Sequence, residues 1–418
     1  MPAATPIPRG PTVLTLYSAA DLLTGPGCPI CRYVGEASDR YLAWFALEGH
    51  ADAAAVTRLC SSLGMCARHT RGLMSQPGAA RRLTAVYRYL IREARDRLTG
   101  RAAQPGSCPA CGHDDGAAGR ALDTLLDGVA NDLVRDRCRE LGGLCIPHVR
   151  AASAQGNHRT LAWLAQMMTA AASARPASPG WLAGTDHDAA ARAVLRDTLP
   201  ATALPRSGAC AACLAAARSE ASHLARIARS SDRGQPDRRP LLCAGHLSDL
   251  TVLAGQREAG SLLAWQAESL AAALTRPAQP LRRRSDGWLR SRRHHAPGPG
   301  PCPVCLASEA AARRAVDDLG ATLRSAHPVP GRLVPLCVRH LLGLRAADPW
   351  AGHVTASGAI ERADRLIAEL DQAFTNGTWA HRHQPQGPEM TAWRRAAAFL
   401  DGGVFCGCRS PRPGRQPG

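Results

Sequence analysis

The chain contains no lysine, few aromatic residues and no long apolar run, and each shortage excludes a class of function. All 51 basic residues of the 418-residue chain are arginine. A Walker A phosphate loop, a pyridoxal Schiff base and a lysine nucleophile all need the amine of lysine, so none of them can be built here. Aromatic residues make up only 4% of the chain. The abundance of alanine and leucine therefore predicts a helical core rather than an aromatic-rich sheet.

Segments for export or membrane insertion are also missing from the pattern. The first eleven residues are rich in proline and show no basic region followed by an apolar one, so we expect no signal peptide. The longest uncharged stretch, 160–174, is shorter than the roughly 20 apolar residues that a membrane-spanning helix needs. We therefore expect a cytoplasmic protein without membrane association. In a reducing compartment, abundant cysteine indicates metal or redox chemistry rather than structural disulfides.

Cysteine is abundant, and most of the 16 cysteines follow a repeated pattern. Four times along the chain a Cys-x-x-Cys pair is followed by a Cys-x-x-His pair after a gap of 29 to 34 residues. The four repeats are Cys28, Cys31, Cys66 and His69; Cys108, Cys111, Cys145 and His148; Cys210, Cys213, Cys243 and His246; and Cys302, Cys305, Cys337 and His340. Leu or Met precedes the third cysteine of every repeat, and Pro follows the first cysteine in three repeats. Self-similarity of this kind predicts a repeat architecture.

Each repeat offers three cysteines and one histidine as ligands. Disulfides would leave one cysteine per repeat unpaired, whereas a tetrahedral Cys3His zinc site uses all four ligands. We therefore expect about four zinc ions per chain, because mixed thiolate and imidazole sites suit zinc. An iron–sulfur site with the same ligands is an alternative. Haem attachment is excluded, since it needs a histidine directly after the second cysteine and no repeat has one.

Helical periodicity accompanies the ligand pairs. The two ligands of Cys-x-x-His are three residues apart, which places them on one face of the first turn of a helix. Between the pairs, apolar residues such as Leu122, Leu125 and Val129 recur at helical spacing, and an amphipathic segment follows the second pair. The prediction is an all-α fold, a tandem array of four metal-pinned helical modules. Each metal is expected to close its own module and to supply stability that the small core lacks.

Segments rich in proline and glycine set the expected boundaries of the modules. The predicted segments are module 1 at 12–100, module 2 at 101–175, module 3 with a preceding linker helix at 176–276, a basic linker at 277–295, module 4 with a closing helix at 296–400 and a disordered tail at 401–418. Cys60 and Cys138 lie outside the repeated pairs and are expected in the core. Cys406 and Cys408 in the tail are open to metal binding, oxidation or an unstructured state.

The tandem pattern and the closing segment resemble a bacterial protein family that is known only as an uncharacterised domain of unknown function. The family pattern combines Cys-Pro-x-Cys and Leu-Cys-x-x-His units with an Arg-His-x-Pro and a Trp-Arg-Arg-Ala segment. Here these closing segments are residues 382–385 and 393–396. The family usually shows two units, whereas this chain has four. The resemblance implies the architecture and no activity.

The closing segment also carries candidate contacts for an anion or a partner. The candidates are Arg382, His383, Trp393, Arg394 and Arg395. Guanidinium groups can bind an anion through paired hydrogen bonds. The alternative that the sequence favours is a final helix that packs its tryptophan on module 4 and leaves its arginines in solvent.

The function that we predict is a zinc-binding scaffold or interaction protein without catalysis. Four protein ligands at each zinc leave no open coordination position, which a catalytic zinc requires. The expected partner is another protein. One alternative is a zinc-dependent nucleic-acid-binding regulatory protein, because the net charge is +17 and a dense arginine cluster occupies 282–293. A second alternative is a thiol-redox or metal-responsive switch.

Overall fold

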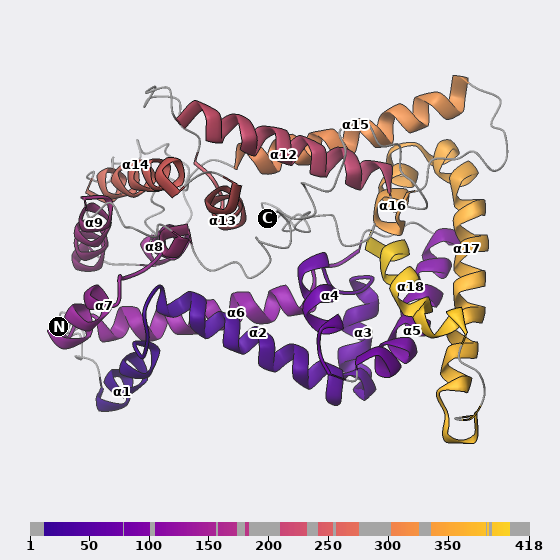
Figure 1. The fold of residues 1–418 in the computed structure, drawn as a ribbon, viewed down its shortest axis with the longest axis horizontal. Helices are drawn as coiled ribbons and strands as arrows, with labels where there is room; N and C mark the ends of the chain where they lie inside the picture. Colours follow the sequence, from indigo (N-terminus) through magenta and orange to yellow (C-terminus); the bar gives the residue numbers. More distant parts are fainter. Residues whose placement is uncertain are drawn as a thin grey trace, which may run out of the picture. The chain divides into compact units, whose positions relative to one another are not determined.

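The structure, a computed structural model, describes most of the chain in twelve segments. The described residues are 12–77, 79–100, 105–155, 158–173, 180–183, 210–231, 241–253, 256–275, 302–325, 336–381, 383 and 387–401. Within them every regular element is a helix and no strand occurs, so the all-α prediction is confirmed (Figure 1). None of these helices is long and apolar enough to cross a membrane. The predicted basic linker at 277–295 and the tail cysteines Cys406 and Cys408 lie outside the described residues.

The chain divides into two compact units that do not follow the predicted module boundaries. Unit 1 comprises residues 1–36, 116–193 and 224–303, and unit 2 comprises residues 37–115, 194–223 and 304–418. Each unit therefore combines segments from several of the sequence repeats. The four repeats are not four separate compact bodies, because each repeat contributes residues to both units.

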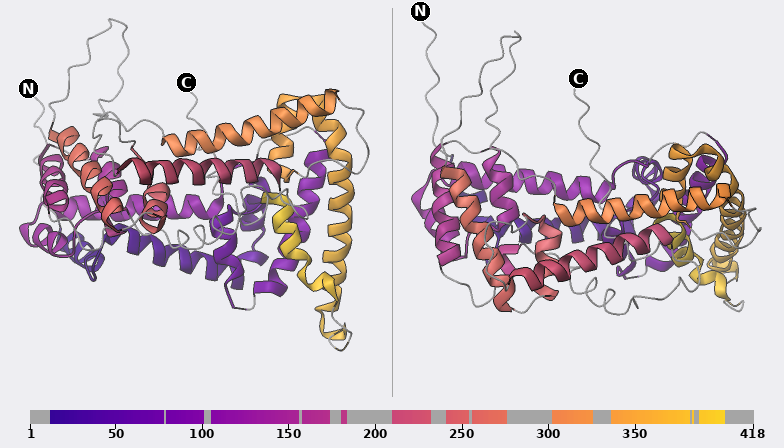
Figure 2. Two further views of the ribbon diagram at one scale, coloured as in Figure 1. Left: turned by 45° about the horizontal axis from the view of Figure 1, so that its top comes forward. Right: turned by 90° about the horizontal axis from the view of Figure 1, so that it is seen from above.

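Four long helices each begin directly after the first cysteine of a repeat. They are α2 (Pro29–Leu47), α6 (Pro109–Gly128), α12 (Ala211–Ser231) and α15 (Pro303–Ser325). Proline is the first residue of three of them, where its fixed φ suits the helix and its missing N–H is not needed. Within unit 2, the start of α12 lies beside α15 (Figure 2). There Ser219 donates to the carbonyl of Ala307 (3.1 Å) and Ser308 donates to the carbonyl of Ala216 (3.3 Å).

Unit 1 has its largest helix contact between α9 and α14. Its remaining complete helices are shorter than these two. Apart from parts of the long helices, unit 1 contains α1 (Val13–Leu22), α7 (Asp132–Glu140), α8 (Ile146–Ser153), α9 (His158–Ser173), α10 (Gly180–Ala183), α13 (Ala244–Leu253) and α14 (Gln256–Thr275). Leu164 and Met168 of α9 and Leu262 and Leu263 of α14 are buried. The amphipathic segments predicted after the Cys-x-x-His pairs thus form helices with buried apolar faces.

Unit 2 is organised around the packing of α5 on α17. Apart from parts of the long helices, it contains η1 (Gly49–Ala51), α3 (Ala53–Ser61), α4 (Ala67–Met74), α5 (Ala79–Thr99), α16 (Val338–Ala347), α17 (Pro349–Asn376), η3 (Trp379–His381), η4 (Pro388–Thr391) and α18 (Ala392–Asp401). Arg88 and Arg92 of α5 pair with Asp371 of α17, and Arg95 pairs with Asp364. Since residues later in α5 pair with residues earlier in α17, the two helices run antiparallel. Their apolar faces enclose the core of unit 2.

The turn that leads into the Cys-x-x-His pair is left-handed in the first two repeats. Leu63 and Gly64 have φ of 53° and 98°, and Gly142 and Gly143 have φ of 99° and 83°. These residues stand three and two positions before Cys66 and Cys145 in the chain. Two successive left-handed residues reverse the chain at the end of a short helix and present the next cysteine as the N-cap of a new helix.

We expect Gly143→Ala to destabilise the folded chain more than Gly64→Ala. Both substitutions place a side chain at a left-handed position, which costs about 1 kcal/mol. At Gly143 the new Cβ would also clash with the Sδ atom of Met167, whereas at Gly64 the nearest atom, Cδ1 of Leu90, lies 3.6 Å away. Overpacking adds about 1–3 kcal/mol at Gly143. Denaturant unfolding at constant zinc measures the difference, and equal unfolding midpoints for the two variants would contradict it.

Candidate metal centres

The sixteen predicted ligands gather in four Cys3His groups. In each group the potential ligand atoms all lie within 4.8 Å of one another. The groups are centre 1, with Cys28, Cys31, Cys145 and His148; centre 2, with Cys66, His69, Cys108 and Cys111; centre 3, with Cys210, Cys213, Cys337 and His340; and centre 4, with Cys243, His246, Cys302 and Cys305. The sequence therefore identified side chains that the fold brings together in sets of four.

The grouping of these ligands differs from the predicted one. Every centre combines the Cys-x-x-Cys pair of one repeat with the Cys-x-x-His pair of another, so the prediction that each module closes on its own metal is wrong. The physical reason is the length of the helices. The 19 residues of α2 extend about 28 Å, whereas the nine residues of α3 return only about 14 Å. Cys66 therefore stays near the far end of α2, where the Cys-x-x-Cys pair of the second repeat meets it.

The distances between sulfur atoms are those expected around a tetrahedral metal ion. The Sγ atoms of Cys31 and Cys145 are 3.6 Å apart in centre 1, and those of Cys66 and Cys111 are 3.7 Å apart in centre 2. A disulfide needs about 2.05 Å between its sulfur atoms. Around zinc, with Zn–S bonds of about 2.3 Å, tetrahedral geometry separates two sulfurs by about 3.8 Å. The thiols are thus spaced for a shared metal ion and not for a disulfide bond.

All four histidines direct the same ring nitrogen, Nδ1, toward the cysteine sulfurs. In the Cys-x-x-His pairs the Sγ–Nδ1 distances are 3.3 Å at His69, 3.1 Å at His148, 3.2 Å at His246 and 3.2 Å at His340. The helical backbone explains this uniformity, because the histidine stands three residues after the cysteine that precedes the helix. The opposite nitrogen, Nε2, does not face the sulfurs, and at His69 it contacts Asp114.

Each centre lies between the N-termini of two helices. At centre 1, Cys28 precedes the first residue of α2, and Cys145 is the N-cap of α8. Three thiolates and a neutral imidazole around Zn²⁺ leave a net charge of about −1. The partial positive charge and unpaired N–H groups at a helix N-terminus stabilise such negative charge. The cysteines therefore lie at helix N-termini, where the backbone stabilises the negative charge of thiolates.

The surroundings of centres 1 and 3 favour positive charge at their histidines. Burial by itself would lower the pKa of the His148 and His340 imidazoles, but hydrogen bonds and attraction to the cysteine sulfurs outweigh it. The pKa of His148 is raised to about 10 by Cys28 and Cys31, and that of His340 to about 10 by Cys210 and Cys337. The same clusters that attract a proton to the imidazole can attract a metal cation in its place.

Asp114 supports centre 2 and was not identified from the sequence. Its Oδ2 atom lies 2.9 Å from Nε2 of His69, and the side chain of Asp114 is buried. Burial by itself would lower the pKa of His69, but its hydrogen bonds to Asp114, Cys108 and Cys66 raise it to about 11. A carboxylate on the second nitrogen of a metal-binding histidine fixes its tautomer and ring orientation.

We expect Asp114→Ala to weaken zinc binding at centre 2 by about 10-fold to 100-fold. Without the carboxylate, the buried Nε2–H of His69 loses its acceptor and the ring is no longer held in place. A competition titration with a zinc chelator measures the affinity of the weakest ion. Asp115→Ala is the matched control, because Asp115 is the adjacent carboxylate and is exposed. An Asp114→Ala affinity equal to that of the control would refute this assignment, and Asp114→Asn is expected to restore part of the affinity.

Two cysteines outside the repeated pairs are absent from the four groups. Cys138 on α7 is fully buried, and burial raises the pKa of its thiol to about 12. Cys60 on α3 is partly buried and packs against the core of unit 2. Both positions agree with the prediction that these cysteines are core residues.

The closing segment forms a packed helix, α18. Its two described arginines contact other side chains of the protein. Trp393 of α18 is buried in the core of unit 2. The guanidinium of Arg394 lies 5.1 Å from the centre of the Trp393 ring, and that of Arg395 lies 2.6 Å from Glu369. His383 is exposed, and Arg382 lies outside the described residues. Trp393, Arg394 and Arg395 of this predicted anion site thus have intramolecular contacts.

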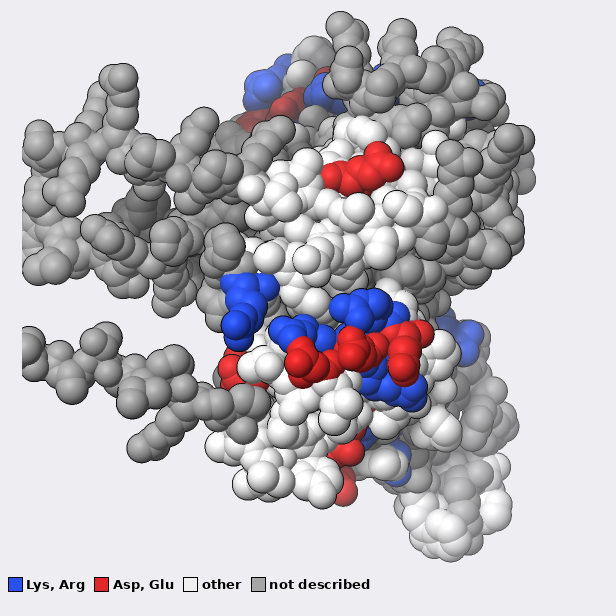
Figure 3. Space-filling view, turned by 90° about the vertical axis from the view of Figure 1, so that its left-hand side faces the viewer, with Lys and Arg blue, Asp and Glu red and all other residues white. Residues whose placement is uncertain are grey.

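Several arginines on the described surface lie close to acidic side chains. On the face drawn in Figure 3, blue and red side chains neighbour one another instead of forming a separate basic area. On α7, Arg135, Arg137 and Arg139 pair with acidic residues one turn away, Asp132, Glu140 and Asp136. The arginine cluster predicted at 282–293 lies outside the described residues.

Comparisons of the chain with protein-family models, with curated proteins and with solved structures find no match. The resemblance of the repeats to an uncharacterised bacterial family therefore stays a prediction. Any functional proposal for this chain depends on its own residues, and above all on the geometry of the four centres.

Proposed function

We propose that the protein is a zinc-binding helical scaffold in which four structural zinc ions hold segments that are distant in the sequence. The observation that carries this proposal is the arrangement of sixteen cysteine and histidine ligands in four Cys3His groups. The mixed thiolate and imidazole ligands favour zinc over harder cations such as Mg²⁺ or Ca²⁺. Their spacing also fits zinc bond lengths.

The composition of the centres supports a structural function over a catalytic one. A catalytic zinc is held by three protein ligands and keeps its fourth position for water or substrate. Each group here offers four protein ligands. Many of these ligands are also buried, including Cys108, Cys145, Cys210 and His69. Closed and buried sites of this kind contribute to folding and not to chemistry at the metal.

A protein partner is favoured by the apolar residues that α1 exposes. Val13, Leu14 and Tyr17 are 69%, 78% and 69% exposed, and Tyr17 stands one helical turn after Val13 and Leu14 on the same helix. Contiguous exposed apolar side chains are typical of protein interaction sites. A nucleic-acid surface would need available basic groups instead, whereas Arg88, Arg95 and Arg395 in unit 2 are paired with carboxylates.

The test of this proposal is metal analysis of the purified chain. We expect about four zinc ions per chain, and a chain loaded with Co²⁺ should show the visible absorption of a tetrahedral thiolate complex. Cys138→Ala is the matched control, since it removes a buried thiol that belongs to no centre, and it should retain four ions. A parent chain with no bound zinc, or with iron and sulfide instead, would overturn the proposal.

Nucleic-acid binding is tested separately by an electrophoretic mobility shift at two salt concentrations. Phosphate recognition by arginine predicts binding that weakens steeply as salt is raised. For a protein-binding scaffold we expect no shift at physiological ionic strength. A salt-sensitive shift with nanomolar affinity would favour the regulatory nucleic-acid-binding alternative.

A further inference from the structure

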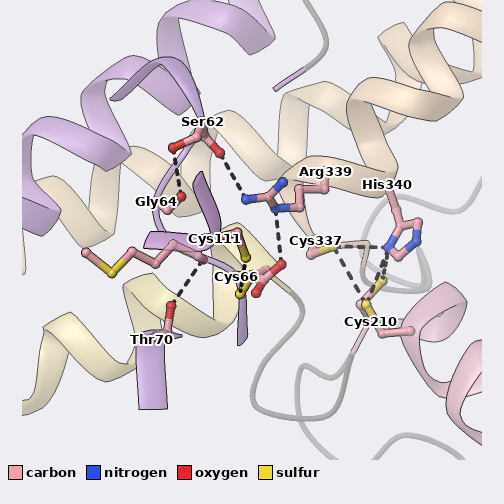
Figure 4. A network of polar contacts seen from close by, with 12 residues as sticks. Ser62, Gly64, Cys66, Thr70, Cys111, Cys210, Cys337, Arg339 and His340 are labelled. Atoms are coloured by element: carbon pink, nitrogen blue, oxygen red, sulfur yellow. Dashed lines mark hydrogen bonds and ion pairs between the residues drawn. The ribbon is translucent and has the colours of Figure 1, made fainter. Parts of the chain in front are cut away.

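In unit 2, an arginine on the ligand helix of centre 3 contacts the segment that leads into centre 2. Arg339 stands between Cys337 and His340 at the start of α16. Its Nη2 atom donates to the carbonyl oxygen of Ser62 at 2.9 Å (Figure 4). Its Nε atom also lies 3.1 Å from Oδ1 of Asp401, the last residue of α18. The guanidinium thus joins the helix that carries centre 3 to a segment from a different repeat.

Ser62 occupies a position that controls how Cys66 is presented. It is the C-cap of α3 and is fully buried. Its hydroxyl donates to the carbonyl oxygen of Gly64 at 2.9 Å, across the left-handed turn that leads to Cys66. Arg339 therefore supports the turn at its origin. A change in Arg339 would be transmitted through four residues to a ligand of centre 2.

The same arrangement occurs in unit 1 with different residues. Arg150 stands two residues after His148 on α8, the ligand helix of centre 1. Its Nη1 atom donates to the carbonyl oxygen of Leu242 at 2.8 Å, and Leu242 directly precedes Cys243 of centre 4. Its Nη2 atom lies 3.2 Å from Oε1 of Gln266, which is fully buried. In both units, then, an arginine on the helix that carries the histidine of one centre contacts the backbone. The backbone that it contacts lies just before the Cys-x-x-His pair of a second centre.

We propose that metal binding is coupled in pairs of centres, centre 2 with centre 3 through Arg339 and centre 1 with centre 4 through Arg150. The proposal rests on the proposed function, because it assumes that the centres hold zinc. Each pair consists of one centre from the N-terminal half of the chain and one from the C-terminal half. Binding of zinc at one centre of a pair raises the zinc affinity of the other, so the two halves bind and release metal together.

The physical basis of the coupling is the position of each arginine on a helix whose first turn carries two metal ligands: Arg339 lies between the ligands of α16, and Arg150 lies two residues after the histidine of α8. When zinc binds centre 3, Cys337 and His340 fix the first turn of α16, and Arg339 lies in that turn. When the metal leaves, the turn loses this support and the buried carbonyl of Ser62 loses its charged donor. A buried acceptor left without its partner is unfavourable. By thermodynamic linkage, loss of zinc from centre 2 must weaken centre 3 by the same factor.

The test uses the full-length chain and a variant in which centre 3 cannot bind zinc. Cys337→Ala should retain three ions, and the weakest of them should bind about tenfold more weakly than any ion of the parent chain, within the usual range of coupling between sites. A chelator competition titration measures these affinities. Adding Cys66→Ala to this background should remove the weakened ion, because that ion belongs to centre 2. Adding Cys28→Ala should leave it in place.

Arg339→Gln provides a second route that keeps every ligand. We expect it to bind four ions and to weaken centre 2, and Cys337→Ala should then cause no further weakening there. Arg137→Gln is the control, since this exposed arginine pairs with Glu140 on α7. Three ions of parental affinity in Cys337→Ala would overturn the coupling and leave the zinc scaffold standing. A parent chain without zinc would instead overturn the proposed function on which the coupling rests.

Discussion

The double variant Cys28→Ala/Cys145→Ala is expected to retain three zinc ions, whereas Cys28→Ala/Cys66→Ala should retain only two. Both variants lose two cysteines, so their chemical change is the same. Cys28 and Cys145 are ligands of one centre, while Cys28 and Cys66 belong to two different centres. If each repeat closed on its own metal, the numbers would be reversed. Counting zinc per chain by elemental analysis therefore tests the interleaved arrangement directly.

The loss of stability should follow the number of centres removed. A structural zinc contributes on the order of 10 kcal/mol of binding free energy, which is comparable to the total stability of a typical domain, about 5–15 kcal/mol. We expect Cys28→Ala/Cys66→Ala to lose more helical circular dichroism than Cys28→Ala/Cys145→Ala. The control is Cys60→Ala/Cys138→Ala, which removes two thiols that lie in none of the centres and should keep four ions. Equal zinc content in the two ligand variants would refute the grouping.

Removal of all zinc by a strong chelator is expected to unfold most of the chain. The core is poor in aromatic residues, and several core cysteines are also ligands, among them Cys108, Cys210 and Cys337. Without a metal, the three thiols and the imidazole of each centre remain largely buried without the ion that pairs them. Burying polar groups without a partner is unfavourable. Far-ultraviolet circular dichroism should show a large loss of helix on chelation.

The reversal of this effect distinguishes metal dependence from damage by the chelator. Adding Zn²⁺ in excess over the chelator should restore the helical signal, and Mg²⁺ should not, because thiolate ligands do not suit it. The thermal midpoint gives a second measurement, since a ligand that binds only the folded state raises it. A zinc-free chain with the helicity and melting temperature of the loaded chain would show that the metals are dispensable.

The sequence contained enough information to find the ligands but not to group them. The recurrence of Cys-x-x-Cys and Cys-x-x-His identified all sixteen residues, because each pair is a local feature within one turn of chain. Which pairs share a metal depends on the distance between them in space. A helix of nine residues, α3, is too short to bring the chain back along the 19 residues of α2. The lengths of the periodic segments in the sequence already contained this difference. The partner from another repeat could not be derived from local patterns.

Asp114 shows a second limit of the pattern. In the sequence, Asp114 and Asp115 read as an ordinary pair of solvated carboxylates. In the structure Asp114 is buried against His69. One signal could have found it: Asp114 stands three residues after Cys111, so it shares a helical face with a ligand. That spacing marks Asp114 but not its partner, because His69 belongs to another repeat.

The interleaved ligands also have a consequence for the order in which the protein is made. The contact between His69 and Cys108 closes a loop of 39 residues, and this loop lies inside the loop of 114 residues between Cys31 and Cys145. In the second half, the contact between His246 and Cys302 spans 56 residues inside the 124 residues between Cys213 and Cys337.

Shorter loops close at a lower entropic cost, by about 1 kcal/mol for the first pair of loops. As the chain leaves the ribosome, the inner centre of each half also has its ligands available first. Once the inner loop is closed by its metal, a shorter length of unconstrained chain separates the ligands of the outer centre. The nesting therefore gives assembly a direction, in which each half closes from its middle outward as its last Cys-x-x-His pair is synthesised.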